Sequence, residues 1–127
     1  MRIYADTSVF GGVFDDEFSS PSTEFFKEVR EQRFHLVSSA VVEREIMFAP
    51  EAVREFFANM LLLAEVVEVT PGVLDLRNAY IQSGVVTEKS KADATHVALA
   101  TVSACEVIVS WNFKHIVNYR RIPLYNA

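Results

Sequence analysis

The chain has 127 residues, of which 50% are apolar, and its formal net charge is -5. This length suffices for a hydrophobic core without disulfides or bound metals, so we expect residues 1–127 to form a single domain. The negative charge argues against a protein that coats nucleic acid through many phosphate contacts. The acids are concentrated in residues 1–70, which hold thirteen Asp and Glu and six Lys and Arg, against four and six in residues 71–127. An anionic substrate can therefore still approach the C-terminal half.

Cysteine content and hydropathy indicate where the protein works. Cys105 is the only cysteine, which excludes an internal disulfide and fits a reducing compartment. The first residues, MRIYAD, contain no long apolar stretch, so we expect no signal peptide. The longest apolar run, residues 60–64, is too short to cross a bilayer. We therefore expect a soluble cytoplasmic protein that makes no membrane contact.

The first predicted element is a short strand over residues 2–5, in which Ile3 and Tyr4 favour extended backbone. Asp6 follows at its carboxyl end, before a hydroxyl-rich turn and the glycine pair at residues 11–12. In open α/β sheets ligands bind at that edge, which makes Asp6 a candidate site residue. The alternative is that Asp6 or Thr7 only caps the turn by accepting backbone N–H bonds.

Further along the chain, strands are predicted to alternate with helices. Ser39 is expected to cap one helix, Pro71 to occupy the first position of another, and Gly84 to end that one. The predicted segments are a helix from about 20 or 22 through 29, a strand at 34–38, a helix from 40 to about 49, a helix at 51–64, a strand at 65–70, a helix at 71–83, an alanine-rich helix from 87 or 90 to about 104, a buried strand at 105–110, a short turn or helix at 111–118, and a strand near 121–125. This alternation predicts an α/β fold with a mainly parallel sheet covered on both faces.

Polar side chains follow several of these strands. Because the carboxyl ends of parallel strands share one edge, residues distant in sequence can meet there. Clustered carboxylates repel one another unless they keep protons or bind a hard divalent cation. Carboxylate and amide oxygens suit Mg²⁺ or Mn²⁺, which promote phosphodiester cleavage, whereas His and Cys are too scarce for a convincing zinc site. The candidates are Asp6, Glu43, Glu45, Asp93, Ser110 and Asn112.

Several of these residues also have a purely structural interpretation. Glu43 and Glu45 can be solvated helix residues, and Asp93 can form a surface ion pair with a nearby lysine. We expect His96, one helical turn after Asp93, to be packed or hydrogen-bonded rather than a metal ligand. Trp111 is expected in the core, and the residue after it can cap the segment that follows.

Four segments taken in order, YADTSVF, SAVVEREI, KADATHVALA and VSWNFKHIVN, closely resemble the PIN-domain family. The resemblance spans almost the whole chain and extends to the VapC-like toxin ribonucleases of bacterial toxin–antitoxin pairs. It implies a three-layer α/β/α sandwich around a mainly parallel sheet, with acidic residues at the strand ends that bind Mg²⁺ or Mn²⁺ for RNA hydrolysis. It also implies an RNA substrate, an antitoxin partner and a homodimer.

Carried over by position, the resemblance assigns catalytic and metal-binding roles to four residues. Asp6 matches the first acid of the family. Ser39 and Ile46 flank the second acid at the family spacing and select Glu45, with Glu43 as the nearby alternative. The third and fourth positions fall on Asp93 and Asn112, and Ser8 and Ser110 are at best supporting or water-binding groups.

Asn112 is a departure from the family pattern, which often has Asp at the fourth position. An amide keeps a carbonyl oxygen but removes one negative charge, which weakens metal binding. His115 and Ile116 stand where many toxin members have Asp-Phe. An alternative function is therefore a catalytically weak or inactive PIN-like binding module. A phosphatase that uses Asp6 as nucleophile is a weaker alternative, because the usual second Asp is replaced by Ser8.

Overall fold

The computed structural model describes residues 1–84 and 91–112 of the chain. Strands and helices alternate along most of this length, as predicted. In chain order the elements are β1 (Arg2–Ala5), α1 (Thr7–Gly12), α2 (Ser19–Arg30), β2 (His35–Ser39), α3 (Ala40–Ile46), α4 (Glu51–Leu61), β3 (Ala64–Val67), α5 (Pro71–Gln82), α6 (Lys91–Val102) and β4 (Val107–Val109). The strand predicted near 121–125 and most of the segment predicted at 111–118 lie outside the described residues.

The four strands form one sheet in the order β3-β2-β1-β4, and every neighbouring pair is parallel. Tyr4 of β1 is opposite Val37 of β2 on one side and Ile108 of β4 on the other. This register brings the carboxyl ends of β1, β2 and β4 to one edge, where Asp6, Ser39 and Ser110 lie. The prediction of a mainly parallel sheet is confirmed.

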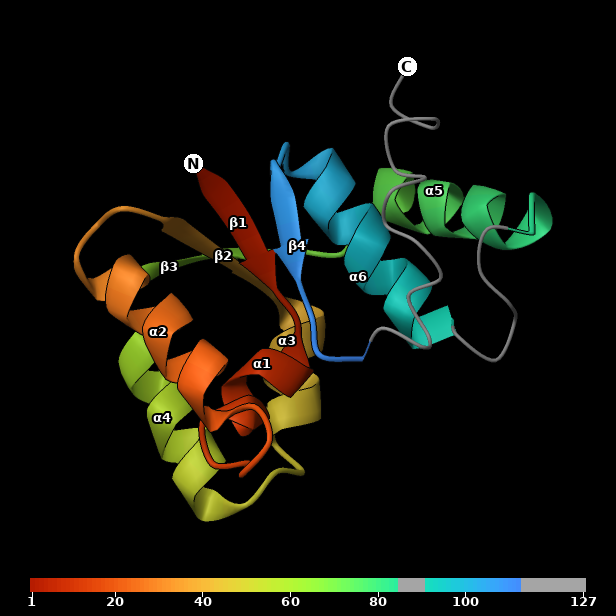
Figure 1. Ribbon diagram of the computed structural model, residues 1–127. Coiled ribbons are helices and arrows are strands. Elements are labelled where there is room, and N and C mark those ends of the chain that lie inside the picture. The colour runs from red at the N-terminus through yellow and green to blue at the C-terminus, as the bar shows by residue number, and fades with distance from the viewer. Residues whose placement is uncertain (85–90, 113–127) are drawn as a thin grey trace.

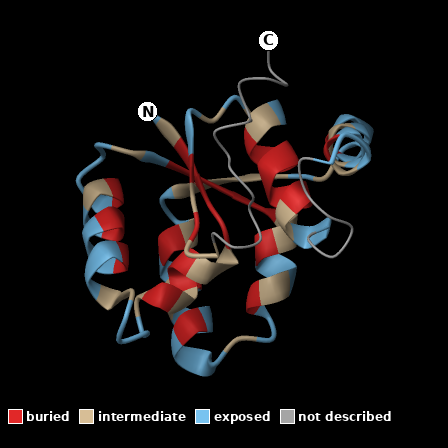
Figure 2. Cartoon of the chain, turned by 45° about the vertical axis from the view of Figure 1, so that its right-hand side comes forward, coloured by how far each residue is buried: buried red, intermediate tan, exposed pale blue. Residues whose placement is uncertain are grey.

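Helices cover both faces of this sheet, so the fold is a three-layer α/β/α sandwich (Figure 1). Helix α1 packs against α2 and α4 on one side, whereas α6 packs against β4 and α5 on the other. Buried residues concentrate in the strands and on the inner faces of the helices (Figure 2). Phe10, Phe26 and Phe57 form an aromatic cluster with ring centroids about 5 Å apart. In the part of the chain that the structure describes, no helix is long and apolar enough to cross a membrane.

The start of α3 and both ends of α5 lie close to where their capping residues predict. Ser39 Oγ accepts a hydrogen bond from Val42 N at 3.2 Å and caps α3. Thr70 caps α5 and Pro71 is its first residue. Gly84, with φ of +76°, follows the end of α5 in the left-handed region that glycine adopts without strain. The predicted start of α6 at residue 87 or 90 lies outside the described ranges.

Helix α1 is the main departure from the predicted elements, since a turn was expected over residues 7–12. The glycine pair lowers helix propensity, but tertiary packing overrides it. A Cβ on Gly12 would lie 2.7 Å from Trp111 Nε1 and closer still to Ser22 Oγ, so only glycine fits there. Gly12 therefore allows α1 to lie directly against α2 and the residues after β4.

The remaining differences concern boundaries and burial. Strand β3 occupies 64–67 rather than 65–70, and α4 ends at Leu61 because residues 62–63 already turn toward β3. Strand β4 is shorter than predicted and less buried, since Val107 is 38% exposed. It is the last strand of the described sheet, so its outer side lacks a neighbouring strand there.

Candidate active site at the carboxyl edge of the sheet

Asp6 is a buried carboxylate, 3% exposed, at the junction of β1 and α1. It is the cap of α1, and Ser8 donates to its Oδ1 from both the backbone N, at 3.0 Å, and Oγ, at 2.6 Å. Within the described residues no hydrogen bond reaches Oδ2. The capping interpretation is therefore confirmed, and capping engages only one of the two carboxylate oxygens.

Ser8 links Asp6 to the residues that follow β4. Its Oγ accepts a hydrogen bond from Trp111 N at 2.9 Å, and Trp111 Nε1 donates to Ser22 Oγ at 2.8 Å. The indole stacks on Phe18 with an interplanar angle of 2° and packs against the core, in line with the expectation for Trp111. Ser8 is thus hydrogen-bonded both to Asp6 and to the segment after β4.

Glu45 is on α3 and faces α1 and α6. Its Oε1 accepts from Thr7 Oγ1 at 2.5 Å and from His96 Nε2 at 2.8 Å. As in Asp6, two donors hold one oxygen while no hydrogen bond to the other, Oε2, occurs in residues 1–84 and 91–112. Partial burial opposes ionisation of Glu45, but the hydrogen bonds from His96 and Thr7 outweigh it and lower the pKa of this carboxyl group. Glu45 is therefore ionised at neutral pH, and its side chain is 36% exposed.

His96 is 3% exposed and uses both ring nitrogens in hydrogen bonds. Nδ1 is 2.6 Å from the hydroxyl of Tyr4, which is 2.8 Å from Ser39 Oγ. The expectation that His96 is packed or hydrogen-bonded is confirmed. Burial raises the pKa of the Tyr4 phenol, so this hydroxyl stays protonated. The sequence did not predict that Thr7 would hydrogen-bond Glu45 or that Tyr4 would hydrogen-bond His96. Both residues are ordinary choices for a strand and the turn after it, so neither indicates a site.

Asp93 and Asn112 lie on the two segments that flank this network. Asp93 is in the first turn of α6, one turn before His96, and is partly buried. Asn112 follows β4, where its backbone N donates to Ser110 Oγ at 3.0 Å. Over the described ranges, no group of three or more His, Cys, Asp or Glu side chains is placed to hold a common metal ion. The structure thus links Asp6 and Glu45 through the first turn of α1, and a shared site that includes Asp93 stays a prediction.

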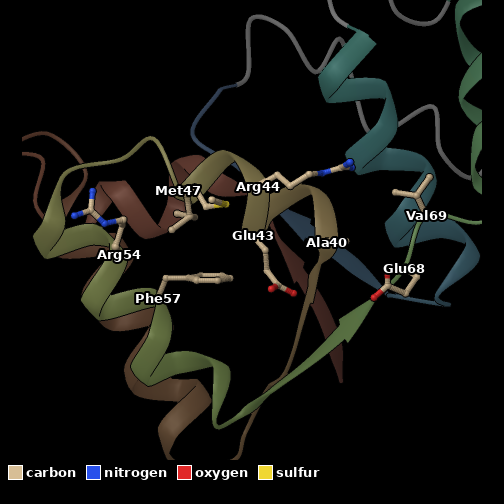
Figure 3. A pocket seen from close by; sticks show the side chains of 9 residues that line it. Ala40, Glu43, Arg44, Met47, Arg54, Phe57, Glu68 and Val69 are labelled. Carbon is tan, nitrogen blue, oxygen red and sulfur yellow. The ribbon is translucent and has the colours of Figure 1, made fainter.

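Glu43 lies on another side of α3 from Glu45. It lines a cavity of about 670 Å³ between α3, α4 and the residues after β3, together with Phe57 and Glu68 (Figure 3). The Glu43 carboxylate and the Phe57 ring point toward this cavity, whereas the Arg44 side chain points away from Glu43. None of the four predicted site residues lines the cavity. Glu45, rather than Glu43, is the acid that meets Thr7 and His96.

The donor set fits a hard cation better than a soft one. Asp6 and Glu45 offer carboxylate oxygens, whereas both nitrogens of His96 are engaged. Cys105 is a half-buried thiol whose pKa burial raises to about 11, so it is not a thiolate at neutral pH. Mg²⁺ is often held by only one or two carboxylates, with waters and substrate phosphate as further ligands. Asp6 and Glu45 therefore suit Mg²⁺ or Mn²⁺ in chemistry and number.

Comparison with solved structures places this fold among known ones. The chain is similar to a chain in the crystal structure of VapBC2 from Rickettsia felis bound to a DNA fragment from their promoter, with a TM-score of 0.66 and 16% sequence identity. The alignment covers 97% of this chain and 94% of that chain, so the shared fold extends over nearly the full length of both. No family model and no curated protein sequence matches the chain.

Proposed function

We propose that this chain is a metal-dependent ribonuclease that hydrolyses RNA phosphodiester bonds with Mg²⁺ or Mn²⁺. One observation carries the proposal: Asp6 and Glu45 each have one oxygen held by two hydrogen-bond donors and a second oxygen that accepts none from the described residues. Carboxylates that ligate metals are typically fixed by such outer hydrogen bonds. Thr7, the neighbour of Asp6, donates to Glu45, so the two acids are held by the same helical turn.

In this proposal Asp6 and Glu45 hold the cation, and Asp93 and Asn112 contribute directly or through water. When bound, the cation would stabilise charge on the phosphate and lower the pKa of attacking water. The residues of the chain would fix the carboxylates, and one carboxylate would accept a proton from the attacking water. Single-stranded or looped RNA is the expected substrate, because its backbone can bend into a site that a duplex does not enter.

The narrower proposal is that this ribonuclease is the toxin of a toxin–antitoxin pair, works as a homodimer and is held by an antitoxin. It is supported by the resemblance to VapC-like toxins together with the fold shared with a chain of the VapBC2 structure. Co-expression with the product of a small reading frame next to the gene tests it. The proposal predicts a complex that survives size-exclusion chromatography and suppresses RNA cleavage.

The test of the enzymatic proposal is cleavage of single-stranded RNA by the purified chain with Mn²⁺, with and without EDTA. Asp6→Asn and Glu45→Gln should each lower the rate by about 100-fold or more, since each removes the negative charge of a proposed ligand. Glu55→Gln, which changes an exposed acid of α4, is the matched control and should cleave like the wild type. Cleavage that resists EDTA or is unchanged in both site variants would overturn the proposal.

A second candidate function, a PIN-like binding module without activity, is favoured by Asn112. An amide at this position leaves the site one negative charge short of the family pattern. Asn112→Asp distinguishes the two functions. A wild type that binds RNA without cleaving it, and an Asn112→Asp variant that gains cleavage, would favour the binding module.

A further inference from the structure

A series of short hydrogen bonds links Ser39, at the end of β2, to Glu45 of α3 through side chains of β1 and α6. It runs from Ser39 Oγ to the Tyr4 hydroxyl (2.8 Å), on to His96 Nδ1 (2.6 Å), and from His96 Nε2 to Glu45 Oε1 (2.8 Å). Ser39 and Tyr4 are fully buried, and His96 is nearly so. Water therefore does not compete for the bonds among these three side chains, and the protein itself has to satisfy their donors and acceptors.

The donor and acceptor in each of these hydrogen bonds follow from the groups at the two ends of the series, Val42 N and Glu45 Oε1. A backbone N–H can only donate, so Ser39 Oγ accepts from Val42 N. Among the described residues the only other partner of Ser39 Oγ is the Tyr4 hydroxyl, so the serine hydrogen is donated there. Tyr4 then donates its single hydrogen to His96 Nδ1. At the other end the ionised Glu45 can only accept, so His96 Nε2 carries the hydrogen.

The opposite direction leaves a group unsatisfied. If Tyr4 donated to Ser39, the buried serine hydrogen would have no acceptor among the described residues. Nδ1 would also have to carry a hydrogen, while Nε2 still needs one for Glu45. With the neutral ring and hydrogen on Nδ1 alone, the Nε2 lone pair would face the carboxylate at 2.8 Å. The satisfied arrangement is therefore a neutral imidazole with its hydrogen on Nε2.

We propose that Ser39 and Tyr4 lock His96 in the Nε2–H tautomer, and that His96 is thereby a positioning residue that presents Glu45 Oε2 to a hard divalent cation. Thr7 shares this task by donating to the same oxygen, Oε1. The presentation of Glu45 Oε2 to a cation rests on the proposed function. The tautomer of His96 does not, because it is a property of the metal-free protein. Removing an outer partner of a metal ligand typically weakens metal affinity by about 10–100-fold.

The first experiment is long-range ¹H–¹⁵N NMR of the histidine rings in the metal-free full-length chain, assigned with a His96→Gln variant. We expect the His96 signals of a neutral ring with hydrogen on Nε2 in the wild type. In Tyr4→Phe, which removes the donor to Nδ1, we expect the Nδ1 signal to shift, because that nitrogen loses its hydrogen bond while Glu45 still holds the hydrogen on Nε2. A wild-type ring with hydrogen on Nδ1, or a Tyr4→Phe spectrum identical to that of the wild type, would overturn the lock.

The second experiment measures the dissociation constant of Mn²⁺ alone by calorimetry. His96→Ala should weaken Mn²⁺ binding about 10–100-fold, and His96→Gln, which keeps an amide donor near Nε2, should recover a large part of that loss. Tyr4→Phe should weaken binding several-fold. Its matched control is Tyr80→Phe. This change removes the hydroxyl of another buried tyrosine, which is hydrogen-bonded to Thr101 near the C-terminal end of α6, and it should leave Mn²⁺ affinity unchanged.

These outcomes separate the inference from the proposed function. Equal Mn²⁺ affinity in Tyr4→Phe and Tyr80→Phe, or no recovery in His96→Gln relative to His96→Ala, would overturn the positioning role. A wild type that binds no Mn²⁺ would overturn the proposed function together with the cation part of the inference. The NMR spectra of the wild type and of Tyr4→Phe still decide the tautomer lock in that case, because neither spectrum requires the metal.

Discussion

The contact of Gly12 with Trp111 and Ser22 predicts a large difference between two neighbouring glycine-to-alanine changes. In Gly12→Ala the new Cβ would lie 2.7 Å from Trp111 Nε1 and closer to Ser22 Oγ, so α1 or both partners have to move. Such overpacking costs about 1–3 kcal/mol. Losing the Trp111–Ser22 hydrogen bond adds about 1 kcal/mol.

Gly11→Ala is the matched control, because a Cβ at Gly11 meets nothing within 4 Å. Both changes gain the same helix propensity, up to about 1 kcal/mol, which cancels in the comparison. Gly12→Ala should therefore be less stable than Gly11→Ala by about 2–4 kcal/mol, the sum of the overpacking and hydrogen-bond terms. Urea unfolding followed by circular dichroism measures the difference in the free energy of unfolding.

The same displacement should reach the candidate site, because Trp111 N donates to Ser8 Oγ and Ser8 in turn holds Asp6. We expect Gly12→Ala, and not Gly11→Ala, to weaken Mn²⁺ binding. Two variants with free energies of unfolding within about 0.5 kcal/mol of each other, below any overpacking cost, would refute the packing argument.

Three further predictions concern single positions outside this contact. Ser38 Oγ is buried without a partner in the described residues, so Ser38→Ala should keep or raise the free energy of unfolding measured in urea. Ser39→Ala removes a helix cap and the hydrogen bond to Tyr4, so it should lower the same free energy by about 1–2 kcal/mol. Ala104 has φ of +58°, so Ala104→Gly should raise the melting temperature, reflecting a gain of up to about 1 kcal/mol, and an unchanged or lower temperature would contradict the strain. The hydrogen bonds from Arg2, and next the one from His35, lower the pKa of Glu65 from 4.5 to about 2. This partly exposed pair therefore contributes stability above about pH 4.5 and loses it as the pH falls toward 2. Glu65→Gln should lower the free energy of unfolding by about 0.5 kcal/mol at pH 7, and this difference should vanish near pH 2.

The sheet was predictable because its signals are local. Short apolar runs that alternate with capped helices specify parallel strands, and Ser39, Pro71 and Gly84 each act through their own backbone. Helix α1 was not predictable in this way. Its glycine pair opposes a helix locally, and the reason for Gly12 is a contact with Trp111, about a hundred residues further along the chain.

The same distinction between local signals and long-range contacts applies to the candidate site. That Asp6 ends a strand and that His96 is hydrogen-bonded could be inferred from sequence position. The partners of Glu45 could not, because Thr7 and His96 reach it only through the packing of α1 and α6 around α3. Composition and spacing carry no signal for a bond that depends on how three helices pack.

The central claim, that Asp6 and Glu45 hold a hard divalent cation, is tested most directly by thermal unfolding of the wild type with and without Mn²⁺. At a Mn²⁺ concentration 100 times the dissociation constant, binding adds about 2.7 kcal/mol, which for a chain of this size raises the melting temperature by about 10 °C. We predict this rise in the wild type, its reversal by EDTA, and its loss in Asp6→Asn and in Glu45→Gln. A wild-type melting temperature that does not respond to Mn²⁺, or a rise that persists in both variants, would contradict the claim.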